Sequence, residues 1–142
     1  MINSLEYHLS KRNEKKIDKL KYKVVVFILP VKSVAGVQNN EIRFPFDGKV
    51  EDVFASCKTV GETDTIISVE KIPLSSLEDT SVSWEQIVNN IVITTGKRSN
   101  NGNLINVVNN DINKDDYLRI MIDNIGENIR DISIEVIITI DF

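Results

Sequence analysis

The sequence predicts a mainly β protein, an antiparallel β-sandwich of eight or nine strands, and three observations carry this prediction. Isoleucines recur at every second position near the C-terminus, short apolar runs are separated by turn signals, and no helices alternate with the strands. A parallel sheet, which needs crossover helices, is therefore disfavoured. At 142 residues, 42% of them hydrophobic and 27% charged, the chain is long enough for one core.

A helical arm is predicted ahead of the sandwich, so the chain is expected to divide into an arm over residues 1–21 and a β-sandwich domain over 22–142. Residues 4–20 have helical spacing, but their centre, residues 11–16, is entirely polar. Such a helix buries little of itself when alone. Two interpretations remain open: a solvated arm, or a docking arm that becomes ordered on a neighbouring subunit.

The first predicted strand is the apolar run over residues 22–30, which Pro30 closes. Its continuous apolar character suits a strand buried on both faces, or one lying between a sheet and a partner. Together with the apolar stripe of the arm, this strand is the predicted partner interface. Its residues are Leu5, Leu9, Ile17, Leu20, Val24, Val26 and Ile28.

A loop is predicted over residues 31–40, followed by a strand over 41–46. Pro45 places that strand at a sheet edge or a bend, because proline cannot donate a ladder hydrogen bond. The dipeptide Asp47-Gly48 indicates a turn. Residues 49–59 then form a strand whose alternation slips, which predicts a β-bulge.

Residues 65–72 read as a strand that Pro73 ends. Over residues 83–89 the spacing Ser-x-x-Gln matches a capping box, so one helical turn is predicted there with Ser83 as its cap. Trp84 on this turn is interpreted as a core residue that covers one end of the sandwich. The alternative is an exposed platform on which a sugar stacks.

Short strands are predicted over residues 91–95 and 104–108, separated by an exposed loop over 96–103 that contains no apolar residue. A polar connection over 109–116 leads to the closing pair of strands.

The closing pair comprises strands over residues 117–123 and 129–142. Apolar residues in the second strand fall on every other position, so one face is expected to pack into the core and the other to meet water or a polar partner. These residues are Ile132, Ile134, Val136, Ile138 and Ile140.

The composition disfavours several kinds of chemistry. A net charge of −4 makes a nucleic-acid partner unexpected. The basic residues between 11 and 23 are interrupted by Glu14 and Asp18, which favours a solvated helix face. The single cysteine, Cys57, is interpreted as a buried apolar residue, and the single histidine, His8, lies in the arm. We therefore expect no catalytic residues and no cofactor.

An oxygen-rich segment around residues 109–116 superficially resembles a calcium loop. It lacks the central glycine and terminal glutamate of an EF-hand, and aspartate and asparagine are also what turns use. A plain turn is the preferred interpretation, so no metal site is predicted. The segment contains Asn109, Asn110, Asp111, Asn113, Asp115 and Asp116.

From Phe44 onward the order of features resembles a small jelly-roll domain found in virion proteins of tailed bacteriophages. The segments that carry the resemblance are residues 47–56, 64–71, 83–87 and 111–120, followed by the long terminal strand. The resemblance implies a structural or attachment role as a capsid decoration, head fibre, or tail or baseplate component. It also implies assembly as a trimer or larger ring, and it brings no catalytic residues.

Two hypotheses follow for function. The first is a non-enzymatic virion structural protein that contacts other virion subunits, including copies of itself. The second is a carbohydrate- or receptor-binding module that holds a host-surface glycan through Trp84, Tyr117 or the loop 96–103, although aromatic residues are only 6% of the chain. The N-terminus lacks the pattern of a signal peptide, and the longest apolar stretch, residues 24–29, is too short to cross a bilayer. We therefore expect a protein made in the host cytoplasm and located in the virion, without a membrane partner.

Overall fold

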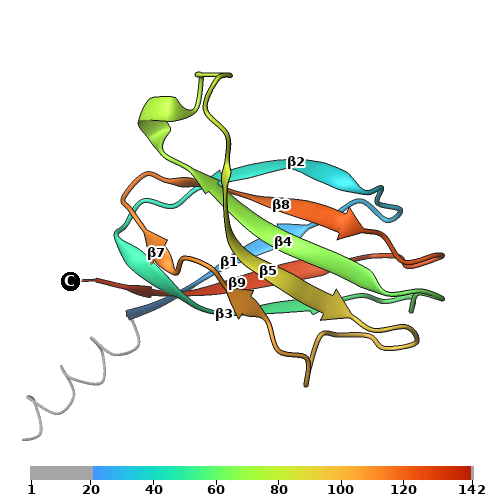
Figure 1. Cartoon of the computed structure of the whole chain (residues 1–142). Coiled ribbons are helices and arrows are strands. Elements are labelled where there is room, and N and C mark those ends of the chain that lie inside the picture. Colours follow the sequence, from blue (N-terminus) through green and yellow to red (C-terminus); the bar gives the residue numbers. More distant parts are fainter. Residues whose placement is uncertain (1–20, 142) are drawn as a thin grey trace, which may run out of the picture.

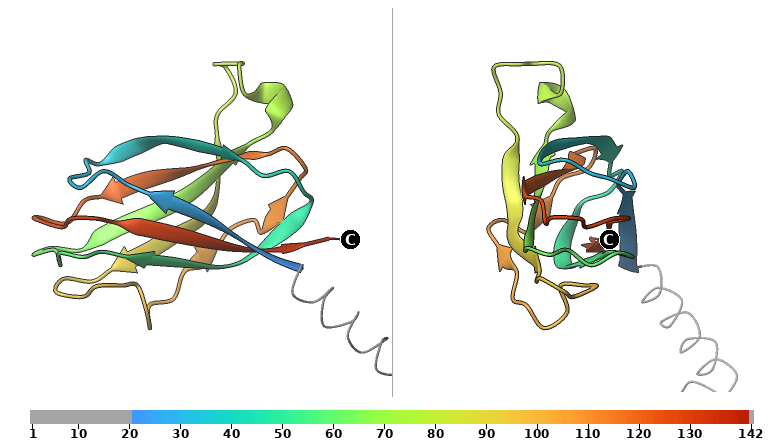
Figure 2. Two further views of the ribbon diagram at one scale, coloured as in Figure 1. Left: turned by 180° about the vertical axis from the view of Figure 1, so that it is seen from behind. Right: turned by 90° about the vertical axis from the view of Figure 1, so that its right-hand side faces the viewer.

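The computed structural model describes residues 21–141, which form two antiparallel sheets packed face to face (Figures 1 and 2). Sheet A has the strand order β1-β9-β3-β7, and sheet B has the order β2-β8-β4-β5-β6. The predicted β-sandwich is thus confirmed. The elements are β1 (Tyr22–Ile28), β2 (Gly36–Arg43), β3 (Gly48–Ser56), β4 (Thr65–Ile72), the 3-10 turn η1 (Leu74–Ser76), β5 (Glu85–Ile93), β6 (Asn106–Val107), β7 (Asp111–Ile112), β8 (Tyr117–Asn124) and β9 (Ser133–Ile140).

The core lies between the sheets and is built by the alternation that the sequence shows. In β9 the four residues Ile134, Val136, Ile138 and Ile140 are all buried, whereas Glu135 between them is exposed. The inner faces of β4, β5 and β8 supply the opposing layer. A single apolar cluster therefore joins both sheets, as the period-two pattern predicts.

The predicted bulge in β3 is confirmed and decides which way its side chains point. The pairing with β9 slips between Val50 and Asp52. Because of the extra residue, Val50 and Val53 both face the core, although they are three positions apart. Phe54 consequently points outward and is 46% exposed.

The prediction that residues 22–30 are buried on both faces is wrong. β1 is an edge strand of sheet A that pairs only with β9 among the described residues. Its inward residues Val25 and Phe27 are buried, whereas the alternate residues Val24, Val26 and Ile28 are exposed. The other alternative, in which a partner covers the outer side of β1, remains a prediction.

Residues 31–40 are not all loop, because β2 begins at Gly36 and continues to Arg43. Backbone pairing with β8 extends the strand through a run of polar residues that the hydrophobic pattern does not mark. Its predicted edge position is confirmed, and its pairing with β8 is irregular between Val37 and Glu41.

The predicted helical turn over residues 83–89 is wrong, since β5 is one continuous strand from Glu85 to Ile93. β5 is hydrogen-bonded to β4 on one side and to β6 on the other. These hydrogen bonds stabilise the extended backbone over the helical turn that the capping box predicts. Ile87 and Val88 are adjacent and both buried, and the shifted register between β4 and β5 accommodates them. The segment before β5, which includes η1, projects from one end of the sandwich (Figure 1).

The strands β1, β3, β6 and β9 are shorter than predicted, and β7 is not predicted at all. β6 spans only Asn106–Val107, and β9 begins at Ser133 rather than at residue 129. Asn128 and Asp131 both have positive φ, which interrupts an extended strand. The connection over 109–116 contains the two-residue strand β7. The helical arm predicted over residues 1–21 lies, except for Lys21, outside the described residues.

Candidate subunit interface

The outer side of β1 carries a row of exposed apolar side chains. Val24, Val26 and Ile28 are 51%, 47% and 71% exposed, and Tyr22 at the start of the strand is 55% exposed. These three predicted interface residues therefore lie together on one face. The other four predicted members, Leu5, Leu9, Ile17 and Leu20, lie outside the described residues.

The apolar row extends across sheet A onto the neighbouring strands. Val24 of β1 is opposite the half-buried Ile137 of β9. Glu135 of β9 lies between two exposed apolar residues, Val26 of β1 on one side and Phe54 of β3 on the other. Cross-strand neighbours of this kind have Cβ atoms about 4.5–5.5 Å apart, so they form one surface. We call this surface the sheet A face. It consists of Tyr22, Val24, Val26, Ile28, Phe54 and Ile137.

Tyr22 and Phe54 belong to the sheet A face but were not among the predicted interface residues. Tyr22 alternates with Val24, so the period-two rule could have added it. Phe54 could not be assigned to a face from the sequence, because the exact position of the bulge decides its direction.

The backbone of β1 is paired on one side only. The amide of Leu29 donates to the carbonyl of Ile132 at 3.0 Å, so the odd-numbered residues of β1 direct their N–H and C=O groups toward β9. The even-numbered residues Tyr22, Val24, Val26 and Ile28 direct theirs to the opposite edge. No strand within residues 21–141 pairs with that edge.

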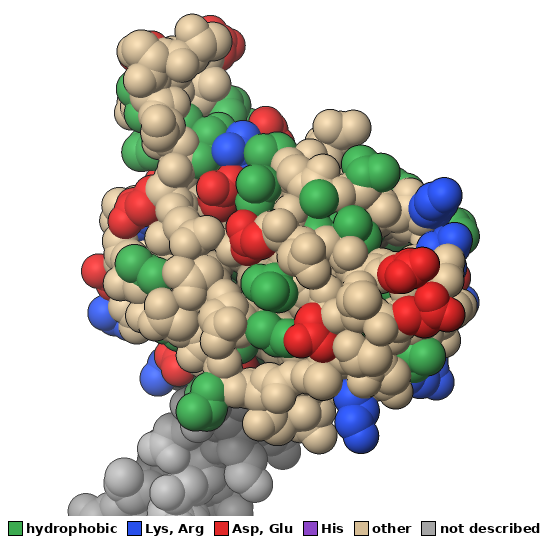
Figure 3. Space-filling view, turned by 45° about the vertical axis from the view of Figure 1, so that its right-hand side comes forward, with side chains coloured by type: hydrophobic (Ala, Val, Ile, Leu, Met, Phe, Trp, Pro, Cys, Tyr) green, Lys and Arg blue, Asp and Glu red, His purple; other side chains and the backbone are tan. Residues whose placement is uncertain are grey.

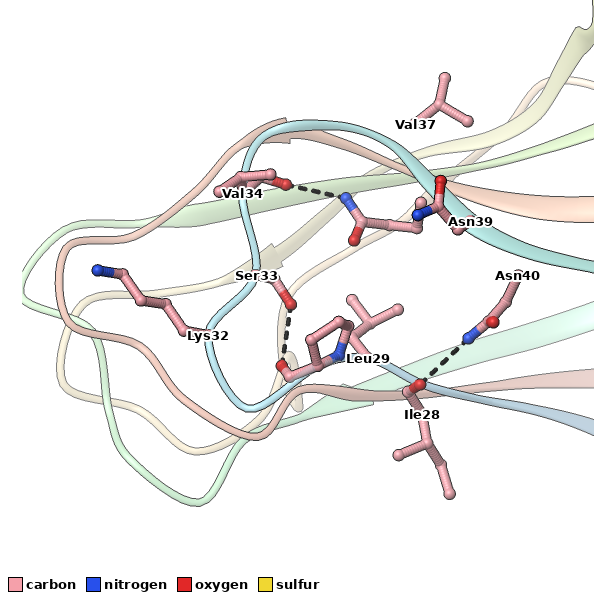
Figure 4. A pocket seen from close by; sticks show the side chains of 10 residues that line it. Ile28, Leu29, Lys32, Ser33, Val34, Val37, Asn39 and Asn40 are labelled. Atoms are coloured by element: carbon pink, nitrogen blue, oxygen red, sulfur yellow. Dashed lines mark hydrogen bonds between the residues drawn. The ribbon is translucent and has the colours of Figure 1, made fainter.

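A hollow of about 430 Å³ adjoins the end of β1, between it and the start of β2. Polar side chains form hydrogen bonds around this hollow (Figure 4). The amide of Asn40 donates to the Ile28 carbonyl at 3.2 Å, and that of Gln38 donates to the Val34 carbonyl at 2.9 Å. Val34 is 70% exposed beside the hollow, so apolar surface continues beyond Ile28.

The oxygen-rich segment over 109–116 is occupied by ion pairs. Asp115 lies 2.6 Å from Arg43, Asp111 lies 3.1 Å from Lys49, and the buried Asp116 lies 3.8 Å from Lys71. Asp116 also accepts a hydrogen bond from the amide of Asn113. Each carboxylate is thus directed to a different cation, which agrees with the turn interpretation. Within residues 21–141 no cluster of three or more His, Cys, Asp or Glu side chains is arranged to hold a metal ion.

Trp84 is not a core residue, and its interpretation as one is wrong. It is half-buried on the outer side of sheet B, where the guanidinium carbon of Arg119 lies 4.1 Å from the ring centroid. Arg119 also donates to Glu70 at 2.8 Å. Arg119 therefore occupies one face of the indole ring, in a cation–π contact.

On the side of the molecule seen in Figure 3, hydrophobic side chains are scattered in small groups among acidic and other polar ones.

The other residues named for glycan binding are partly buried or bonded to the backbone. Tyr117 is half-buried in β8. The loop 96–103 is not fully exposed as predicted, because Asn100 is only 4% exposed and bonds to the backbone of β3. This loop therefore covers part of β3.

Cys57 is buried, as predicted, with 3% of its surface exposed. Burial raises the pKa of its thiol, which keeps the group neutral and poorly nucleophilic. His8 lies outside the described residues.

No protein-family model matches the chain, and no curated protein matches it either. In the part of the chain that the structure describes, no helix combines the length and apolar character needed to cross a membrane.

Proposed function

We propose that this chain is a non-enzymatic structural protein of a tailed-phage virion, which assembles through contacts made by β1 and the sheet A face. The observation that carries the proposal is the row Tyr22, Val24, Val26 and Ile28, each about half or more exposed. A strand that alternates apolar residues on both sides has two faces to bury, and its own sandwich covers only one. Contiguous exposed apolar surface is typical of interaction sites.

The topology supports a jelly roll as the finer description of the sandwich. Strand pairs are nested, with β1 on β9, β2 on β8, β3 on β7 and β4 on β5. A long hairpin rolled into two sheets gives this nesting, and such double-sheet jelly rolls occur in viral capsid proteins and in lectins. Fold alone does not define function, so the exposed face carries the argument.

The partners in this proposal are other virion subunits, including copies of the same chain in a trimer or ring. Its location is the capsid or the tail and baseplate of the particle. Polar neighbours Glu135, Asp52 and Thr139 lie beside the apolar row on sheet A. An apolar centre with polar neighbours is the composition expected of a contact between separately folded subunits.

A carbohydrate- or receptor-binding module is the second and weaker candidate. A stacking platform needs an open aromatic face. Arg119 occupies one face of Trp84, and the amides of Gln86 and Asn89 bond to neighbouring side chains rather than remaining open to a sugar. We therefore place assembly ahead of glycan binding.

Light scattering on the purified full-length chain tests the self-association. We expect an oligomer for the natural chain and a monomer when Val24, Val26 and Ile28 are all replaced by serine. A matched control replaces Leu104 and Val108 by serine in the same way. These residues are 89% and 57% exposed on the β5–β6 side of sheet B, so the control should leave the oligomer intact.

Particle composition tests the virion role. Mass spectrometry of virions purified from producing cells should find the chain in many copies, and the triple serine variant should be depleted from them. A natural chain that stays monomeric at high concentration and is absent from purified particles would contradict the proposal.

A further inference from the structure

Three of the four sheet edges in the described residues have features that prevent strand addition. β6 and β7 are only two residues long, and β2 has an irregular register. Beyond β7, the outer edge of β3 is covered by the loop 96–103, where the amide of Cys57 donates to the Arg98 carbonyl at 2.9 Å. Short length, bulges and covering loops are the usual devices that keep an edge from pairing with another chain.

The fourth edge, β1, has none of these devices from Tyr22 to Val26, and only its last carbonyl, that of Ile28, accepts a hydrogen bond from the Asn40 side chain. It pairs with β9 over seven consecutive positions without a register shift. It contains no proline and only one charged residue, Lys23, and it consists otherwise of β-branched and aromatic residues. In the part of the chain that the structure describes, the outward backbone groups of Tyr22, Val24 and Val26 have no backbone partner. This edge is thus built to accept another strand.

We propose that β1 pairs edge to edge with β1 of a second copy, in an antiparallel, two-fold symmetric contact. The inference rests on the proposed function, since it specifies one of the contacts through which the subunits assemble. Sheet A of one copy would continue into sheet A of the other, forming one eight-stranded sheet in which the two β1 strands are central. An isologous contact of this kind is the commonest in homo-oligomers.

The spacing of β1 favours a second copy in antiparallel orientation. The register that opposes Val24 to the partner's Val26 also opposes Tyr22 to the partner's Ile28, so every outward-facing residue has a matching position. Antiparallel pairing puts Lys21 and Lys23 of the two copies at opposite ends of the ribbon. Parallel pairing would place these like charges side by side, which is destabilising.

The contact also brings the two apolar rows together. In the paired sheet Val24 and Val26 of one copy lie beside the same residues of the other, on the same side as Phe54 and Ile137. The two sheet A faces become one continuous apolar surface, available for a further subunit. The pairing therefore explains both the unprotected edge and the exposed side chains.

Hydrogen exchange of the full-length chain, resolved by residue and measured at high and low protein concentration, tests the pairing. Val25 and Phe27, whose amides bond to β9, should exchange slowly at both concentrations. Tyr22, Val24 and Val26 should exchange at least about tenfold more slowly at high concentration only, because their amides bond to the second copy. Protection of these amides that does not change with concentration would show that a segment of the same chain occupies the edge, and would overturn the inference.

A proline substitution separates edge pairing from packing of the sheet A face. Val24→Pro removes an outward amide and no β9 ladder bond, so the fold should survive at this edge position. Two symmetric hydrogen bonds are lost per dimer, which should weaken self-association roughly a hundredfold. Val24→Thr keeps the amide and the branched shape, and should associate nearly as the natural chain does.

The outcomes also distinguish this inference from the proposed function. If the natural chain self-associates and enters particles but Val24→Pro associates as well as Val24→Thr does, the edge pairing is wrong and face packing is the contact. If the natural chain neither self-associates nor enters particles, the proposed function itself fails. Circular dichroism confirms that each variant keeps its strand content.

Discussion

A buried amide side chain helps to join the loop 96–103 to sheet A. The oxygen of Asn100 accepts from the amide of Ala55, and its nitrogen donates to the carbonyl of Val53, both at 3.0 Å. The side chain is buried, so both bonds replace contacts with water that the group can no longer make. Asn100 therefore holds the segment that covers the outer edge of β3.

We predict that Asn100→Asp lowers the free energy of unfolding by about 1–3 kcal/mol, because a carboxylate oxygen would face the Val53 carbonyl without a proton to donate. Urea denaturation followed by circular dichroism measures the change. The neighbouring Asn101→Asp is the matched control, since Asn101 is exposed and should stay within about 0.5 kcal/mol of the natural chain. Equal effects at the two positions would contradict the role assigned to Asn100.

Little of this residue-scale detail could be predicted from the sequence. Asn100, Asn101 and Asn103 lie in one polar segment, and nothing in its composition indicates which amide is buried. Trp84 was misplaced for a similar reason. Its size favours burial, but its cover is the charged side chain of Arg119, thirty-five positions away in the sequence.

At the scale of elements, β5 combines a long strand with a local irregularity. Asn90 has a φ of 56°, in the left-handed region, where the register of β4 and β5 shifts. Asparagine tolerates this conformation better than most residues do, and a β-branched residue does not. The irregularity is what allows Val88 and Ile91, three positions apart, to face the same core.

Substitutions at Asn90 should therefore follow backbone preference rather than β-propensity. We predict that Asn90→Val destabilises the fold by about 1–2 kcal/mol, although valine is the better strand former. Asn90→Gly should remain within about 1 kcal/mol of the natural chain, because glycine reaches positive φ without strain. Thermal unfolding of both variants measures the difference, and a more stable valine variant would contradict the assignment.

Sequence patterning predicted the strands with clean alternation and failed where polar residues pair. β8 and the central part of β9 are predicted within a few residues of their bounds, since apolar residues recur there at every second position. β4 is predicted as well, because it is a short run rich in isoleucine and valine that Pro73 ends. The start of β2 was missed because Gln38, Asn39 and Asn40 carry no hydrophobic signal. The first half of β5 was misread because adjacent Ile87 and Val88 imitate a helical face.

At the scale of the whole molecule, both sheets depend on one core. Strands from the beginning, middle and end of the chain contribute to the same apolar cluster. Cys57 is the only cysteine, so no intrachain disulfide assists the packing. The sandwich is therefore held by burial and by the strand ladders, and neither sheet has a core of its own.

We predict a single cooperative unfolding transition for the sandwich. The fluorescence of Trp84, which reports on sheet B, should change at the same denaturant concentration as the circular dichroism of both sheets. Two separate midpoints would show that the sheets unfold independently. Dilution experiments at several protein concentrations separate this transition from dissociation of the oligomer.

The candidate interface shows the same limit of prediction on a larger scale. The sequence indicated Val24, Val26 and Ile28 as interface residues because they lie in a continuous apolar run, and the structure shows them on one exposed face. It could not show that β1 lies at an edge, because strand order depends on contacts between residues far apart in the chain. The openness of that edge, rather than its apolar composition, is what indicates how a second copy would bind.

The nested pairing of the first and last strands also affects how the chain is made. Among the described strands β1 leaves the ribosome first, but its only described neighbour, β9, begins at Ser133. At translation rates of roughly 5–20 residues per second, the nascent β1 stays without that neighbour for about 5–20 s. During that interval its inward residues Val25 and Phe27 lack the strand that pairs with them, so the first described strand to be synthesised completes its ladder only when the last one has been made.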